Sequence, residues 1–118
     1  MAQKTHAPKG KPFDLVESVA YADGAVVSKT LIDKGIGNIT LFSFDAGQGL
    51  SEHTSPFDAV VHILDGQSQI TIGGHTQTVS AGQMIIMPAG IPHALDAKKP
   101  FKMLLTMIRA KQELQPEQ

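Results

Sequence analysis

The sequence predicts an all-β domain, because short alternating apolar segments recur along it, turn signals separate them, and no long segment has helical periodicity. The chain has 118 residues, fewer than the ~150 of a typical domain, so we expect one domain. The expected strands cover residues 13–19, 25–32, 38–44, 59–64, 69–72, 75–80, 83–87, 93–95 and 101–108. Many short strands at this spacing are typical of a sandwich or a barrel.

Turn-forming residues separate these segments. Asp65-Gly66 and Gly73-Gly74 are both favoured hairpin turns, and Ala81-Gly82 precedes the apolar run at 83–87. The segment 88–92, with a proline at each end, interrupts strand pairing. The nearest approach to a helix is the segment that begins at Phe101, which we interpret mainly as a strand.

The two ends differ from the middle. Residues 1–12 are predicted to form a flexible arm, residues 13–109 the barrel domain, and residues 110–118 a polar tail. The polar, lysine-containing N-terminus has no apolar stretch of the kind found in a signal peptide, and no apolar run approaches the ~20 residues of a membrane-spanning helix. We therefore expect a cytoplasmic protein.

Composition narrows the chemistry. The chain is 42% hydrophobic with a net charge of −1, which gives no electrostatic reason to expect nucleic-acid or membrane binding. It has no cysteine, so disulfides, thiolate nucleophiles and cysteine-ligated metals are excluded. The five histidines, the carboxylates and a few hydroxyls remain as candidate functional groups.

Two windows that contain glycine and proline at turn positions each supply one histidine that we expect at the start of an inward-pointing strand. The first, Gly49 to Gly66, contains His53, and the second, Gly82 to Ala97, contains His93. We expect these histidines on facing strands of a small barrel, where they share its interior. His62 is an odd number of residues from His53 and is predicted to point outward.

The two windows resemble the motifs of the small single-domain cupins. In the second motif Gly82, Pro88, Gly90 and His93 stand at the family's spacing, although Ala97 replaces an asparagine. The resemblance spans roughly residues 35–108 and implies a double-stranded β-helix, or jelly-roll, barrel. It also implies the family's functions, which include metal-dependent dioxygenases, isomerases and decarboxylases, and metal-free epimerases that use a histidine base.

The first motif departs from the family at two metal-ligand positions. His53 and Gly66 fit, but Ser55 stands at the second histidine position and Ala59 at the glutamate position. Only His53 and His93 remain as metal candidates, and two imidazoles are fewer than a tightly held divalent ion normally needs. No cofactor is therefore certain. A weakly bound Zn, Ni, Mn or Fe ion stays open as an alternative, with Asp58, Glu52 or Gln83 as a further ligand.

Strand alternation from His53 onward, together with the last strand, predicts an apolar pocket with two imidazoles near its mouth. Its expected lining residues are His53, Ser55, Phe57, Ala59, Val61, His93, Met103 and Leu105. Methionines 84, 87, 103 and 107 are expected to add a soft, adaptable lining, although a core and dimer interface filled by methionine is the alternative.

The sequence is compatible with three functions. The first is a ligand-binding cupin that holds a small, partly apolar molecule between His53 and His93. The second is an enzyme in which one of these imidazoles is a general base. The third is a structural barrel whose own side chains fill the pocket. In each case we expect a homodimer.

Overall fold

The computed structural model describes residues 2–3 and 7–110, and these residues form two β-sheets that face one another. The elements are β1 (Ala2–Gln3), a 3₁₀ turn η1 (Val16–Ser18), β2 (Val26–Lys34), β3 (Gly37–Phe44), β4 (Gly49–His53), β5 (Phe57–Asp65), β6 (Gln67–Ile72), β7 (His75–Ser80), β8 (Met84–Met87), β9 (His93–Asp96) and β10 (Phe101–Arg109). The all-β prediction is confirmed. Among these elements no helix is long and apolar enough to cross a membrane.

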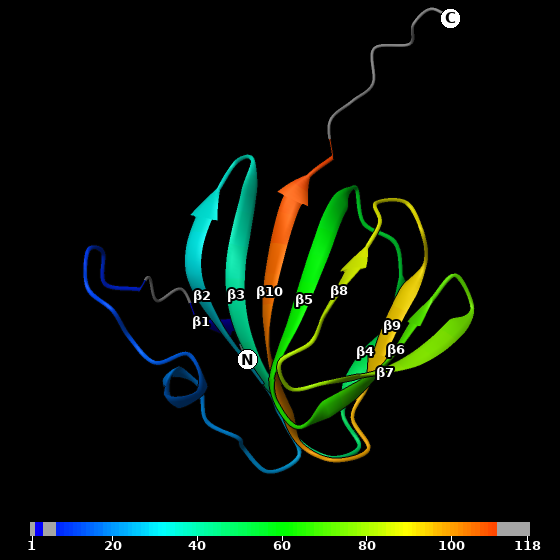
Figure 1. Cartoon of the computed structure of the whole chain (residues 1–118), viewed down its shortest axis with the longest axis horizontal. Helices are drawn as coiled ribbons and strands as arrows, with labels where there is room; N and C mark the ends of the chain where they lie inside the picture. The colour runs from blue at the N-terminus through cyan, green and yellow to red at the C-terminus, as the bar shows by residue number, and fades with distance from the viewer. Residues whose placement is uncertain (1, 4–6, 111–118) are drawn as a thin grey trace, which may run out of the picture.

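The larger sheet has the order β1-β2-β3-β10-β5-β8, and the smaller sheet has the order β4-β9-β6-β7. From β3 onward the chain passes from one sheet to the other at every connection except the β6–β7 hairpin, which winds the two sheets together (Figure 1). This alternation is the double-stranded β-helix that the motifs imply. All pairings are antiparallel except that of β1 with β2.

The core lies between the sheets and is apolar because alternate strand residues point inward. In β5 the buried positions are Ala59, Val61 and Ile63, which follow the predicted alternation. The rings of Phe44 and Phe101 are fully buried and stack with their centroids 4.5 Å apart. These residues belong to one continuous apolar core between the sheets.

The turn at Gly66 differs from the expected hairpin. Asp65-Gly66 does not join two paired strands, because β5 belongs to the larger sheet and β6 to the smaller. Gly66 has φ 76°, and a Cβ there would lie 2.5 Å from the carbonyl oxygen of Pro100, so only glycine fits this crossing. The expected hairpin at Gly73-Gly74 is confirmed, since Ile72 pairs with His75.

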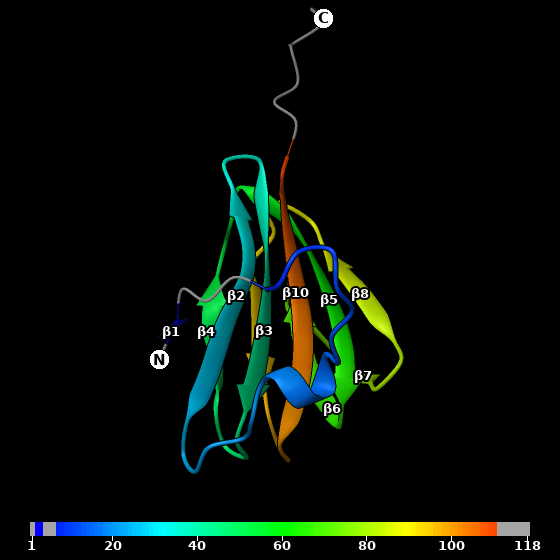
Figure 2. The ribbon, with the colours of Figure 1, turned by 90° about the vertical axis from the view of Figure 1, so that its left-hand side faces the viewer.

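The predicted strand at 13–19 is wrong. This segment contains the short turn η1 and crosses the outer face of the larger sheet (Figure 2). Its apolar side chains at Leu15 and Val19 pack on that face beside Leu31 and Leu41. The apolar residues that suggested a strand therefore contact the sheet from an irregular segment, with Leu15 and Val19 four residues apart.

Polar contacts fasten this segment to the sheet. The Nζ of Lys102 donates a hydrogen bond of 2.7 Å to the carbonyl oxygen of Val16, and the Tyr21 hydroxyl donates one of 2.5 Å to Oδ2 of Asp65. Burial, and then the Asp65 carboxylate, raise the pKa of Tyr21. Part of the predicted arm is also paired, because Ala2 and Gln3 lie parallel to Ser28 and Lys29 of β2.

Candidate functional site

The site is built on β4 and β9, which are neighbours in the smaller sheet. Their register pairs Leu50 with Leu95 and His53 with His93, with an irregularity between the two pairs. Gly49 lets the strands lie this close, since a Cβ at that position would collide with the carbonyl oxygen of Leu95. His53 and His93 are therefore a cross-strand pair in one sheet, and the expectation that they lie on facing strands is corrected.

The irregularity in β4 sets the direction of His53. Leu50 and His53 are three residues apart, so a regular strand would place them on opposite faces. Because one extra residue lies between the two pairs, both Leu50 and His53 line the interior cavity. The chain then turns through residues 54–56 before β5 begins, so His53 and β5 belong to different sheets.

Hydrogen bonds to backbone fix both imidazoles. His53 Nδ1 lies 2.7 Å from the carbonyl oxygen of Ser51, and His93 Nδ1 lies 3.1 Å from that of Ile91. A carbonyl oxygen only accepts, so each Nδ1 carries the hydrogen and donates it. In the neutral ring Nε2 then holds a lone pair, which can accept a hydrogen bond or bind a metal.

The two rings lie edge to face, with their centroids 4.4 Å apart and their planes at 70°. They differ in exposure, since His93 is 3% exposed whereas His53 is open to solvent. Burial lowers the pKa of His93, the Ile91 carbonyl opposes this shift, and the neighbouring His53 adds to it. His93 is therefore neutral at pH 7 and presents an unprotonated Nε2.

The two imidazoles open into an apolar cavity of about 50 Å³ between the sheets. It is lined by Leu50, His53, Ala59, Met87, His93, Leu95, Met103, Leu105 and Met107. The methionines and Ala59 come from the larger sheet, and the histidines from the smaller one. A small, mostly apolar cavity with two imidazoles in its lining is typical of a binding site for a compact ligand.

Five of the eight predicted pocket residues line this cavity: His53, Ala59, His93, Met103 and Leu105. Three predicted residues do not line it. Ser55 lies in the turn after β4, where its Oγ accepts a hydrogen bond of 3.0 Å from the Phe57 amide. The Phe57 ring stacks against the Arg109 guanidinium at 5.3 Å, and Val61 lies deeper in the core.

Sequence reasoning missed Leu50 and Leu95, which line the cavity beside the histidines. The signal for Leu95 was present, because it follows His93 by two residues and so shares its face. Leu50 was hidden by the irregularity in β4. Met84, expected in the lining, is instead 59% exposed on the outside of β8.

The residues considered as a third metal ligand lie elsewhere. Asp58 Oδ1 accepts a hydrogen bond from the Ala89 amide, Gln83 Oε1 accepts one from the Ser80 amide, and Glu52 is exposed. None of the three lines the cavity. Over the described part of the chain, no three His, Cys, Asp or Glu side chains are grouped for metal binding.

Comparison with known proteins agrees with this architecture. Residues 40–108 match the family described as the cupin domain. The chain belongs to the cupin family. This cupin is 32% identical over 81 residues to an uncharacterized protein of Streptomyces coelicolor, which covers 69% of this chain and 76% of the relative.

Solved structures resemble this cupin over most of its length. A conserved protein from Streptococcus pyogenes is 41% identical with a TM-score of 0.86, covering 95% of this chain and 98% of its own. A cupin superfamily protein from Desulfitobacterium hafniense is 27% identical with a TM-score of 0.83, covering 92% and 99%. A cupin 2 conserved barrel protein from Leptotrichia buccalis is 39% identical with a TM-score of 0.79, covering 81% of this chain, which spans about half (47%) of that protein.

The residues present do not fit the family's usual set of three histidines and a glutamate. The Ser55 hydroxyl is used in its own turn, and Ala59 gives the cavity a methyl group at the glutamate position. Two imidazoles without a carboxylate are too few ligands for a tightly held divalent ion.

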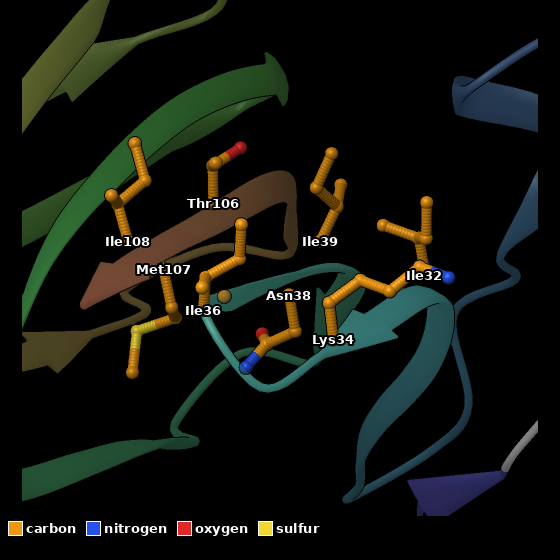
Figure 3. Close-up of a pocket in the computed structure, with 9 residues that line it drawn as sticks. Ile32, Lys34, Ile36, Asn38, Ile39, Thr106, Met107 and Ile108 are labelled. Carbon is orange, nitrogen blue, oxygen red and sulfur yellow. The ribbon is translucent and has the colours of Figure 1, made fainter.

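A second apolar hollow lies on the outside of the larger sheet, at the β2–β3 hairpin. It has a volume of about 350 Å³, and its apolar wall includes Ile32, Ile36, Ile39 and Ile108. These side chains point to one side of the sheet, whereas Met107 points to the other (Figure 3). Ile36, in the hairpin loop, is 77% exposed. We call this hollow the outer groove.

Proposed function

We propose that this cupin is a binding protein in which His53 and His93 anchor a small, partly apolar molecule in the barrel pocket. The observation that carries the proposal is the orientation of the two rings. Both Nδ1 atoms are occupied by backbone carbonyls, so both free Nε2 atoms are available to one ligand in an apolar cavity. Such a site favours a ligand with an O–H or N–H donor and an apolar body.

The size of the cavity limits the ligand. About 50 Å³ is well below the ~300–1,000 Å³ of pockets that enclose drug-sized molecules. The buried part of the ligand is therefore compact, of the order of a short alcohol, and a larger ligand extends through the mouth beside the exposed His53.

The proposal can be tested by NMR titration of the protein with 1-butanol and with phenol. We expect shifts of the His93 ring protons and the methionine methyl signals, and at least a tenfold weaker apparent affinity in His93→Ala. His75→Ala is the matched control, because His75 is an exposed histidine at the start of β7, outside the cavity. Unchanged ring signals, or equal losses in both variants, would contradict the proposal.

An enzyme that moves a proton is the second candidate, favoured by the lowered pKa of His93. A neutral, buried imidazole with a free Nε2 is a suitable general base for a C–H next to a carbonyl. If His93 acts in this way, the protein accelerates deuterium exchange into a small ketone such as acetone, and His93→Ala and His53→Ala lower the rate. Equal exchange rates in all three proteins would remove this candidate.

A further inference from the structure

The cavity is lined by sulfur-containing side chains as well as by the two imidazoles. Three of its nine lining residues are the methionines Met87, Met103 and Met107, which line the same cavity as His53 and His93. Met103 is fully buried and Met87 is 3% exposed. The side chains of Met87 and Met103 are therefore shielded from bulk water.

Sheet register explains why the sulfur atoms gather there. Met107 pairs with Ala59 across β10 and β5, and Ala59 pairs with Met87 across β5 and β8. The three residues form one row on the inner face of the larger sheet, with the smallest side chain in the middle. Ala59 carries only a methyl group, and all three residues of the row line the cavity.

The chemistry of this donor set selects a particular class of ion. Thioether sulfur favours soft Cu(I), and imidazole also binds copper. The described lining contains no carboxylate or thiolate, so every donor is neutral. Burying an ion without a compensating negative charge is costly, and the cost is lower for a single positive charge than for two. A cavity of about 50 Å³ is large enough for one ion.

We infer that the cavity is a binding site for Cu(I), held by Nε2 of His53 and His93 and by thioether sulfur from the methionine row or from Met103. The inference rests on the proposed function only for the role of the two imidazoles. The backbone hydrogen bonds at both Nδ1 atoms hold the rings with Nε2 available, which is the arrangement that histidine ligands usually have.

The test is an anaerobic titration of the whole chain with Cu(I), in competition with the chromophoric chelator bicinchoninate. We expect one Cu(I) per chain and weaker binding of Zn²⁺. A triple Met87→Leu, Met103→Leu, Met107→Leu variant removes sulfur at nearly constant volume, and we expect it to bind Cu(I) at least tenfold more weakly. Met84→Leu is the matched control, because its side chain is exposed on the same strand as Met87.

X-ray absorption of the wild-type Cu(I) complex provides a second measurement that does not require the variant to fold. We expect a sulfur shell together with nitrogen. The inference is overturned by scattering from nitrogen and oxygen alone, by equal affinities in the triple and control variants, or by tighter binding of Zn²⁺. Titration of the triple methionine variant with 1-butanol distinguishes failure of this inference from failure of the proposed function. Alcohol binding requires the imidazoles but not the sulfur atoms, so it should persist in that variant.

Discussion

Replacing Ala59 by glutamate is expected to convert this cavity into a site for Zn²⁺. Ala59 is 1% exposed and lines the cavity opposite His53 and His93, so a glutamate there adds a third protein ligand and a negative charge. Without metal, the larger side chain should lower the free energy of unfolding by about 1–3 kcal/mol, because the cavity is small.

Zinc should restore most or all of this loss. At a Zn²⁺ concentration 100 times the Kd, binding to the folded state alone adds about 2.7 kcal/mol. A chain of 118 residues lies between the size classes that gain roughly 4–8 °C and roughly 2–4 °C in Tm per kcal/mol, so at about 4 °C per kcal/mol we expect an increase of roughly 10 °C on adding Zn²⁺.

The assay is thermal unfolding followed by circular dichroism, with and without Zn²⁺. Ala59→Gln is the matched control, since it has nearly the same shape as the glutamate variant but lacks its charge. We expect Zn²⁺ to raise the Tm of Ala59→Glu much more than that of Ala59→Gln or of the wild type. Equal increases in all three proteins, or none in Ala59→Glu, would refute the placement of residue 59 opposite the two imidazoles.

Three further outcomes follow from other parts of the molecule. We expect a homodimer in which the exposed Ile36 of each copy inserts into the outer groove of a second copy (Figure 3), since a twofold axis pairs the same surface with itself. Light scattering at micromolar concentration should give a dimer for the wild type and a monomer for Ile36→Ser, and a monomeric wild type would exclude this interface. The pKa of His93 is lowered from 6.5 in the folded state, so as the pH falls below about 6.5 this histidine takes up a proton more readily in the unfolded state. The free energy of unfolding measured with urea should therefore fall as the pH drops below about 6.5, and it should fall less in His93→Gln. Tyr21→Phe removes the hydrogen bond to Asp65 and should cost about 0.5–1.5 kcal/mol in urea unfolding, whereas an unchanged stability would mean that this bond does not fasten the N-terminal segment.

Most of the β-strands could be predicted because their alternation follows from burial of one face. The segments 75–80 and 101–108 match β7 and β10 to within one residue, since turn signals bound the first on both sides and Pro100 marks the start of the second. The segment 13–19 failed because alternation alone does not distinguish a strand from a short irregular segment whose apolar residues pack on a sheet. The positions of Leu15 and Val19 fit either a strand or such an irregular segment.

The candidate site was predicted in its residue types but not in its geometry. His53 and His93 follow from the motifs, whereas their pairing in one sheet depends on the turn at 54–56 and on the irregularity in β4. Counting every second residue from His53 into β5 crosses the turn at 54–56, and counting back from His53 to Leu50 crosses the irregularity, and neither feature has a sequence signal. The inclusion of Ser55 and Phe57 in the pocket came from this count.

The residue at position 59 affects which kind of ion the cavity favours. In the row formed by Met107, Ala59 and Met87, a glutamate would occupy the space that the two thioether side chains now share. The same position therefore decides between a site with a buried negative charge, which suits divalent ions, and a neutral site rich in sulfur and nitrogen, which suits Cu(I) or a compact polar molecule. On this reasoning Ala59→Glu should weaken Cu(I) binding while it strengthens Zn²⁺ binding, and a variant that gains both affinities would show that charge at residue 59 does not set the selectivity.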